Sequence, residues 1–214
     1  MKDIPLFTTE AGIASLLLGE IPYKKEAYIR IRDVQPGRLE DLLAECVSFC
    51  RMVGAEAVLA SDHEELEQYT LRFSVIEMRG TILPENGEIN HLFPVTEDTV
   101  TRWREFCNSR LADVDGAATM TAADEKKILS SGGAYFVHRS GELLGAGWVE
   151  GNKVLLICAA VSGGGETVMR TLLSLVDDEQ VVLEVASTND RAIRFYERMG
   201  FIKTAELQKW YKIF

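Results

Sequence analysis

The sequence predicts a mixed α/β (α+β) protein in which a mostly antiparallel central sheet is flanked by helices. Two hairpin signals in the second half, Ser140-Gly141 and Gly151-Asn152, separate three runs of apolar residues, as expected of an antiparallel meander. Apolar residues at helical spacing stand before and after this meander. With 214 residues and 47% hydrophobic content, the chain is long enough to bury a sizeable core.

Composition limits the classes of partner. The formal net charge of −10 argues against binding to the phosphate backbone of nucleic acids. No apolar run approaches the roughly 18 residues that a membrane span needs, so no membrane partner is expected. The opening MKDIPLFTTE lacks a basic segment followed by an apolar one, so we expect no signal peptide and a cytoplasmic location.

The cysteines and histidines predict no metal site. The four cysteines lack CxxC spacing and the three histidines lie far apart, which favours buried, reduced thiols. Cys46 and Cys50 are one helical turn apart, and a shared metal or a bridge between them is the less favoured alternative.

Two helices are expected before the meander. Val100, Trp103, Cys107 and Leu111 recur at helical spacing, and Thr121 begins a second helix as an N-cap with Asp124.

After the meander, the glycines of residues 163–165 lead into a helix, and residues 181–187 form a buried strand. A helix from Asn189 follows, and residues 201–214 are expected to form a closing pair of strands.

The first half repeats part of this order. Residues 5–34 read as strands with turns near Ala11 and Lys24, followed by a helix over 36–54, a strand over 55–61 and a second helix over 64–78. The shared order and spacing indicate an internal duplication. We therefore expect a partial copy over residues 1–80, a linker over 81–93 and a full copy over 94–214.

The glycine cluster of residues 163–165 is the first candidate for chemistry. At the start of a helix the backbone N–H groups have no intrahelical partner and point at any anion placed there. Glycines remove the side chains that would block such an approach, although a sharp loop also requires glycine.

Residues 189–201 add a more specific pattern: Asn, two residues, Ala, three residues, Tyr, three residues, Gly-Phe. It resembles the second signature of the GNAT superfamily of N-acyltransferases, and the resemblance extends from about Asn90 to Phe214. It implies that acetyl-CoA lies against the strand before the glycine loop, with its pyrophosphate at the start of the following helix.

The resemblance carries the cofactor site onto named residues. Gly163 and Gly165 match the family's Gly-x-Gly, and their amides, with those of Gly164 and Glu166, would hold the pyrophosphate. Ala160 stands where the family usually has Arg or Gln, which implies a weaker grip on phosphate. The full implied cofactor set is Ala160, Val161, Gly163, Gly164, Gly165, Glu166, Asn189, Ala192 and Tyr196.

The last helix would contribute three of these residues. Asn189 would hydrogen-bond the pantetheine arm, and it is equally suited to be the helix N-cap. Tyr196 would protonate the departing thiolate as general acid, the alternative being a core tyrosine. Ala192 would allow close approach of the cofactor, whereas Gly200 and Phe201 are a C-cap and a strand anchor.

A general base is harder to choose. An alkyl ammonium with a pKa of about 10.4 must lose a proton before it attacks. The third strand of the meander, residues 153–161, carries no acid, so the candidates are Glu150 and, behind it, Glu184, either of which is also explained as a surface carboxylate. Cys158 is interpreted as buried packing, not as a nucleophile.

The resemblance implies an acetyl-CoA-dependent N-acetyltransferase that transfers the acetyl group directly to a primary amine on a small molecule or peptide. The competing hypothesis is a noncatalytic acyl-CoA-binding or interaction module with the same fold. The first copy lacks the Asn and Gly-Phe of the second and is interpreted as a degenerate repeat that binds no cofactor. The oligomeric state stays open, with a homodimer as one alternative.

Overall fold

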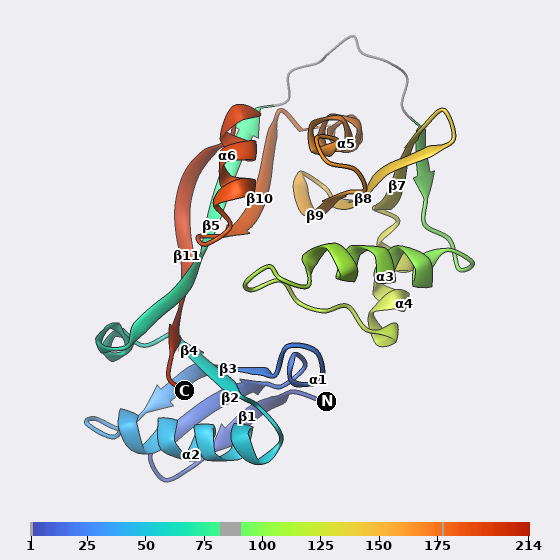
Figure 1. The fold of residues 1–214 in the computed structure, drawn as a ribbon. Coiled ribbons are helices and arrows are strands. Elements are labelled where there is room, and N and C mark those ends of the chain that lie inside the picture. Colours follow the sequence, from blue (N-terminus) through green and yellow to red (C-terminus); the bar gives the residue numbers. More distant parts are fainter. Residues whose placement is uncertain (1, 82–90, 177) are drawn as a thin grey trace. The chain divides into compact units, whose positions relative to one another are not determined.

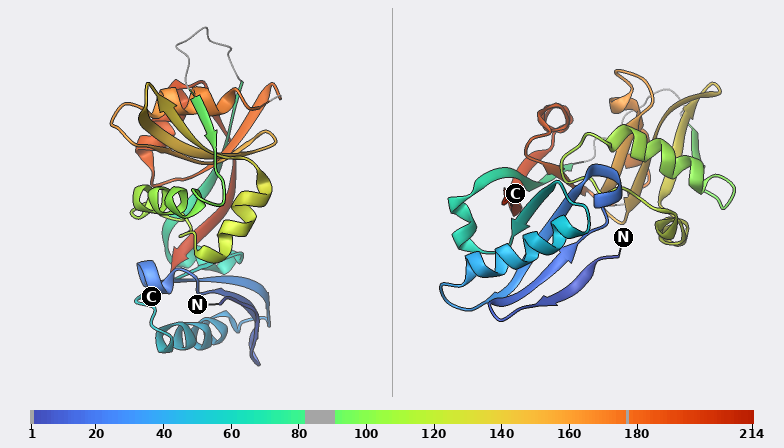
Figure 2. Two further views of the ribbon diagram at one scale, coloured as in Figure 1. Left: turned by 90° about the vertical axis from the view of Figure 1, so that its right-hand side faces the viewer. Right: turned by 60° about the horizontal axis from the view of Figure 1, so that its bottom comes forward.

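The computed structural model describes residues 2–81, 91–176 and 178–214, which fall into two compact units. The first unit consists of Met1–Val75 and Glu206–Phe214, and the second of Ile76–Ala205. Two long strands, β5 (Thr70–Thr81) and β11 (Ile202–Lys212), run from one unit into the other. Figures 1 and 2 show the ribbon from three directions.

In the first unit the strand order is β1-β2-β3-β4-β11. The first three strands form an antiparallel meander, and β4 returns parallel to β3 after helix α2. Figure 1 shows α2 lying along one face of these strands. The elements are β1 (Ile4–Thr8), β2 (Gly12–Leu17), α1 (Ile21–Lys24), β3 (Glu26–Val34), α2 (Leu39–Met52) and β4 (Ala57–Ser61).

Helix α2 forms because its apolar residues share one face, which is buried against the strands. The buried residues are Leu39, Leu42, Leu43, Cys46 and Cys50. Burial raises the pKa of the Cys46 thiol to about 12 and that of the Cys50 thiol to about 11. All four cysteines of the chain are buried, which confirms the expectation of packed thiols.

The helix predicted over residues 64–78 is wrong. Glu64–Gln68 forms only a short 3-10 helix capped by the His63 side chain, and β5 follows at once. Leu66, Tyr69 and Phe73 mimic helical spacing, but tertiary pairing decides the outcome because β5 lies between β11 and β10 in the strand order.

In the second unit the strand order is β11-β5-β10-β9-β8-β7-β6. Both predicted hairpins are confirmed, with left-handed backbone at Ser140, Gly141 and Gly151. The elements are β6 (His91–Pro94), α3 (Val100–Leu111), η2 (Ala122–Asp124), α4 (Glu125–Ser131), β7 (Ala134–Arg139), β8 (Glu142–Glu150), β9 (Lys153–Ala159), α5 (Gly165–Leu173), β10 (Gln180–Ala186) and α6 (Asp190–Arg198). Of the linker predicted over residues 81–93, Thr81 ends strand β5, residues 82–90 lie outside the described residues, and residues 91–93 belong to strand β6, which pairs with β7.

Helices cover both faces of the meander β7–β9. Helix α5 lies on one face, and α3 and α4 lie on the other, as Figures 1 and 2 show. On the α3 side, the fully buried Trp103 packs edge-on against Trp148 and donates its indole N–H to the Tyr135 carbonyl at 3.0 Å. On the α5 side, Gly145 and Gly147 let the helix approach β8 closely.

The end of the chain departs from the prediction of a closing strand pair. Residues 202–212 form the single strand β11, because this stretch contains no glycine, proline, asparagine or aspartate that would turn it. Phe201, just before it, is buried against Gly80, which confirms its role as an anchor. Among the described residues, no helix is long and apolar enough to cross a membrane.

Candidate functional site

The parallel strands β9 and β10 part toward their carboxyl ends. They pair only at Val182↔Lys153 and Leu183↔Val154, near the start of β9. On its other side, β9 stays paired with β8 as far as Gly145↔Ala159. The carboxyl half of β9 therefore directs backbone donors and acceptors toward a gap between β9 and β10 in which no strand of the described residues pairs with them, and such groups require hydrogen-bond partners.

The glycine turn follows β9 at the open end of this gap. Gly163 has a φ of +84°, and a Cβ built there would meet nothing within 4 Å. Gly164 caps helix α5. Within the described part of the chain, the amides of Gly163, Gly165, Glu166 and Thr167 donate to no other residue. Open space and free amides at a helix start suit an anion such as the pyrophosphate of a coenzyme.

The charge near this turn includes one residue that the sequence did not indicate. Arg110, in the last turn of α3, donates from Nη2 to the Ala160 carbonyl at 2.9 Å and lies over the Phe106 ring at 5.5 Å. The Glu166 carboxylate is paired with Arg170 at 2.9 Å, so its negative charge at the helix start is balanced.

Asn189 begins helix α6. Its Oδ1 accepts the Ala192 amide at 3.1 Å, which confirms the predicted N-cap. Helix α6 ends at Arg198 and Gly200 follows with a φ of +91°, where the Phe201 amide donates to the Tyr196 carbonyl at 2.9 Å, as expected of a glycine C-cap.

Thr188, just before Asn189, donates to Asp115 Oδ2 at 2.8 Å. Asp115 belongs to the α3–α4 connection, residues 112–121, which follows Arg110. The stretch from Arg110 to Asp115 thus touches Ala160 beyond β9 and Thr188 beyond β10, the two sides of the gap.

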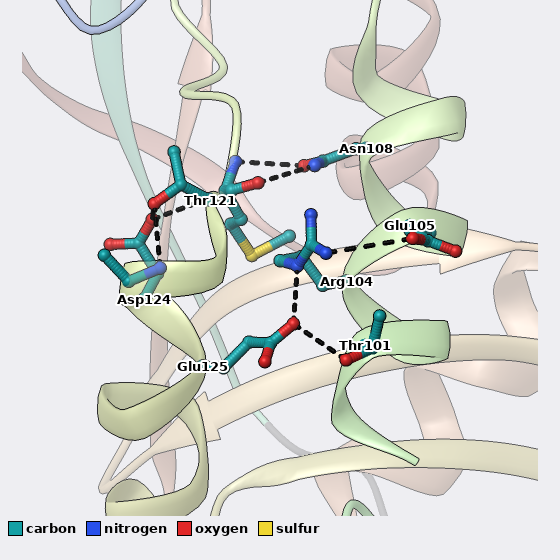
Figure 3. Close-up of polar contacts among 9 residues, drawn as sticks. Thr101, Arg104, Glu105, Asn108, Thr121, Asp124 and Glu125 are labelled. Atoms are coloured by element: carbon teal, nitrogen blue, oxygen red, sulfur yellow. Dashed lines mark hydrogen bonds and ion pairs between the residues drawn. The ribbon is translucent and has the colours of Figure 1, made fainter. Parts of the chain in front are cut away.

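Side chains hold the carboxyl end of this connection (Figure 3). Asn108 donates to the Met120 carbonyl at 2.8 Å and accepts the Met120 amide at 3.0 Å. The predicted cap at Thr121 and Asp124 is confirmed as a reciprocal capping box.

Below it, Arg104 joins Glu125 at 2.8 Å (Figure 3). Hydrogen bonds from Arg104 and Thr101 hold the pKa of the Glu125 carboxyl below its usual range. The network therefore fixes α3 and α4 relative to each other.

Tyr196 projects from α6 into the hydrophobic core between α5, α6 and the sheet of the second unit. It is 8% exposed, and its ring contacts Phe195 and Phe201. Burial raises the pKa of its phenol to about 12, and the nearby Cys158 thiol adds to the shift. Because Cys158 lies on the carboxyl half of β9, the phenol of α6 lies close to the strand that borders the gap.

Cys158 also meets Cys107 of α3, and burial together with this contact raises the pKa of the Cys107 thiol. The burial of Cys158 confirms the prediction that this side chain packs in the core.

Glu150 does not join the residues around the gap. It pairs with Lys153 at the start of β9, whereas Cys158 pairs with Ala146, four residues earlier on β8 and about 13 Å away along the strand. The prediction chose Glu150 because it ends the strand before β9, but the antiparallel register places that strand end opposite the start of β9, away from Cys158. Glu184 lies on β10 and is exposed.

A parted parallel strand pair and a glycine turn at a helix start are features that the resemblance to the GNAT acyltransferases predicted, and the fold is of that class. The family model described as "Acetyltransferase (GNAT) family" matches residues 93–201. The chain belongs to this family.

Several solved structures share the fold. A GNAT-family acetyltransferase from Colwellia psychrerythraea is 14% identical with a TM-score of 0.52, over 96% of this chain and 84% of that one. A GCN5-related N-acetyltransferase from Sphaerobacter thermophilus is 15% identical with a TM-score of 0.54, over 94% and 75%. A tandem GNAT protein from the clavulanic acid biosynthesis pathway is 13% identical with a TM-score of 0.50, over 94% and 78%. A search of curated proteins found no match.

Proposed function

We propose that this protein is an N-acetyltransferase that moves the acetyl group of acetyl-CoA directly to a primary amine. The observation that carries the proposal is the parting of β9 and β10 beside the glycine turn, with the buried Tyr196 phenol near Cys158 of β9. Family membership supports acyl transfer in general.

Acetyl-CoA would supply an activated thioester, and the residues present fit it. The free amides of Gly163, Gly165 and Glu166 are suited to accept the pyrophosphate, next to the exposed Val161. Arg110 at Ala160 supports the site with the positive charge that the motif position itself lacks. The side-chain oxygen of Asn189 accepts the hydrogen bond of the helix cap, and its side-chain N–H groups are the ones proposed to bind the pantetheine arm.

Tyr196 is the proposed general acid. A phenol with a pKa of about 12 keeps its proton at neutral pH, and it can donate that proton to a departing thiolate. Ala192, which precedes it by about one helical turn, leaves room for the cofactor.

The acceptor amine must shed a proton before it attacks. Asp115, held by Thr188 beside the gap, is a better candidate for this role than Glu150 or Glu184, because it belongs to the segment that touches both sides of the gap. The net charge of −10 favours a cationic amine on a small molecule or peptide.

The first unit is proposed to bind no cofactor. Its strands β3 and β4 stay paired over five residues, from Glu26↔Ala57 to Arg30↔Ser61, so they leave no gap like that between β9 and β10. The meander, helix and parallel strand of this unit follow the same order as β7–β9, α5 and β10, which supports the proposed duplication.

Calorimetric titration with acetyl-CoA and CoA tests the cofactor site, and thiol release with a panel of amines tests catalysis. Micromolar binding with turnover of at least one amine supports the enzyme. Binding without turnover of any amine would favour the noncatalytic module, and no binding at millimolar ligand would refute the cofactor site.

Replacing Arg110 tests the contribution of its charge. In Arg110→Met we expect the Kd for acetyl-CoA to rise about tenfold, because one charged hydrogen-bond donor beside the glycine turn is lost. The matched control is Arg102→Met, an exposed arginine on the same helix, which should leave the Kd unchanged. Equal Kd values for the two variants would show that Arg110 only fastens α3 to β9.

A further inference from the structure

A hollow lies where β8 ends and β9 begins, at the end of these strands away from the glycine turn. Its volume is about 610 Å³, within the range of small-molecule sites. It is bordered by the end of β8, the turn between β8 and β9 and the segment after α5, with Glu150, Asn152 and Asp178 among its lining residues. Tyr135 and Leu175 supply apolar surface.

The charge of this hollow has one sign. Glu150 and Asp178 are its two ionisable acids, and no lysine, arginine or histidine is among the described residues that line it. Its wall also includes Ser131 and Gly132 at the carboxyl end of α4, where backbone carbonyls carry partial negative charge.

Several polar groups of the wall lack protein partners. Within the described ranges, the Glu150 carboxylate and the Tyr135 hydroxyl take part in no hydrogen bond or ion pair, and Asp178 accepts only the Gln180 amide at 2.9 Å. Carboxylates with spare acceptor capacity beside an aromatic ring are the groups that hold an ammonium ion.

We propose that this hollow binds a small organic cation, an alkyl amine or diamine, through Glu150 and Asp178, with its alkyl part against Tyr135 and Leu175. The site is separate from the one proposed for transfer. Glu150 lies about 13 Å along β8 from Ala146, the partner of Cys158, and the Tyr196 phenol proposed to act on the thioester lies near Cys158. An amine bound at Glu150 is therefore out of reach of the thioester, and the proposal does not depend on acetyl-CoA binding.

The test uses the full chain without acetyl-CoA and two probes of equal length, 1,4-diaminobutane and butane-1,4-diol. We expect the diamine to bind and the diol not to bind in calorimetry. Amide chemical shifts should move at the lining residues of segments 131–135 and 149–152 and at Leu175 and Asp178. Added salt should weaken binding of the diamine, because salt screens the attraction between its ammonium groups and the carboxylates.

Single substitutions then test whether the two carboxylates bind the diamine. Glu150→Gln and Asp178→Asn should each raise the Kd of the diamine about tenfold, since each removes one ionic partner and keeps the shape of the side chain. Glu142→Gln is the matched control: it removes the same charge from the other end of β8 and should leave the Kd unchanged.

Circular dichroism confirms that each variant is folded. The proposal is overturned if the diol binds as well as the diamine, if the shifts fall outside these residues, or if the control weakens binding as much as Glu150→Gln.

Discussion

Replacing Tyr196 with phenylalanine is expected to lower kcat by about a hundredfold or more while acetyl-CoA still binds, because the departing thiolate loses its proton donor. The change removes one oxygen and leaves the ring against Phe195 and Phe201. No hydrogen bond joins the Tyr196 hydroxyl to another described residue, so its removal leaves no partner unsatisfied. Tm should therefore be unchanged or higher, and loss of turnover then reports on chemistry.

The control is Tyr23→Phe, at a tyrosine that is 55% exposed in the first unit. It should change neither kcat nor Tm. If Tyr196→Phe turned over amine at the original rate across the pH range, Tyr196 would be a packing residue and the acid would be water.

The raised pKa of Tyr196 also predicts how stability depends on pH. Between about pH 10, where the phenol ionises in the unfolded chain, and about pH 12, where it ionises in the folded one, only the folded state keeps the proton. The free energy of unfolding should fall as pH rises through this window, by about 3 kcal/mol in total. Urea titrations of the original protein and of Tyr196→Phe should diverge there, with the variant losing less.

Adding a single methyl group at Gly145 is expected to lower the free energy of unfolding by about 3 kcal/mol and to weaken acetyl-CoA binding. The Cβ of alanine would overlap the Cys158 carbonyl oxygen and would lie 2.7 Å from Val168 Cγ2. Either β9 or α5 must move, and these two elements position the glycine turn between them.

Urea unfolding and calorimetric titration of Gly145→Ala measure both effects. Gly19→Ala is the control, because its Cβ meets nothing closer than Asp3 Oδ1 at 3.8 Å, and it should change stability by no more than about 0.5 kcal/mol. Identical stabilities of the two variants would mean that α5 tolerates displacement from β8.

Local rules predicted much of this fold. The meander followed from Ser140-Gly141 and Gly151-Asn152, whose left-handed backbone is a property of a few adjacent residues. The caps at Thr121 and Asn189 likewise depend on side chains that reach only three residues along the chain.

Predictions failed where distant pairing decides. Strand β5 carries helix-like spacing and becomes a strand because two others flank it. The contacts of Arg110 with Ala160 and of Asp115 with Thr188 join residues 50 and 73 positions apart, and neither has a local signal. Glu150 was chosen without knowing the register that carries it away from Cys158.

The neighbours of β10 bear on how this protein should be dissected. The region that matches the family model begins at residue 93, after β5, yet β5 is the strand beside β10 on the side away from the parted pair. A fragment that begins at residue 93 would lack β5. Its strand β10 would pair with β9 at only two positions, and the other edge of β10 would have no neighbouring strand. Such an edge recruits other chains, so insoluble fragments would reflect a missing strand, and expression trials should begin upstream of Thr70.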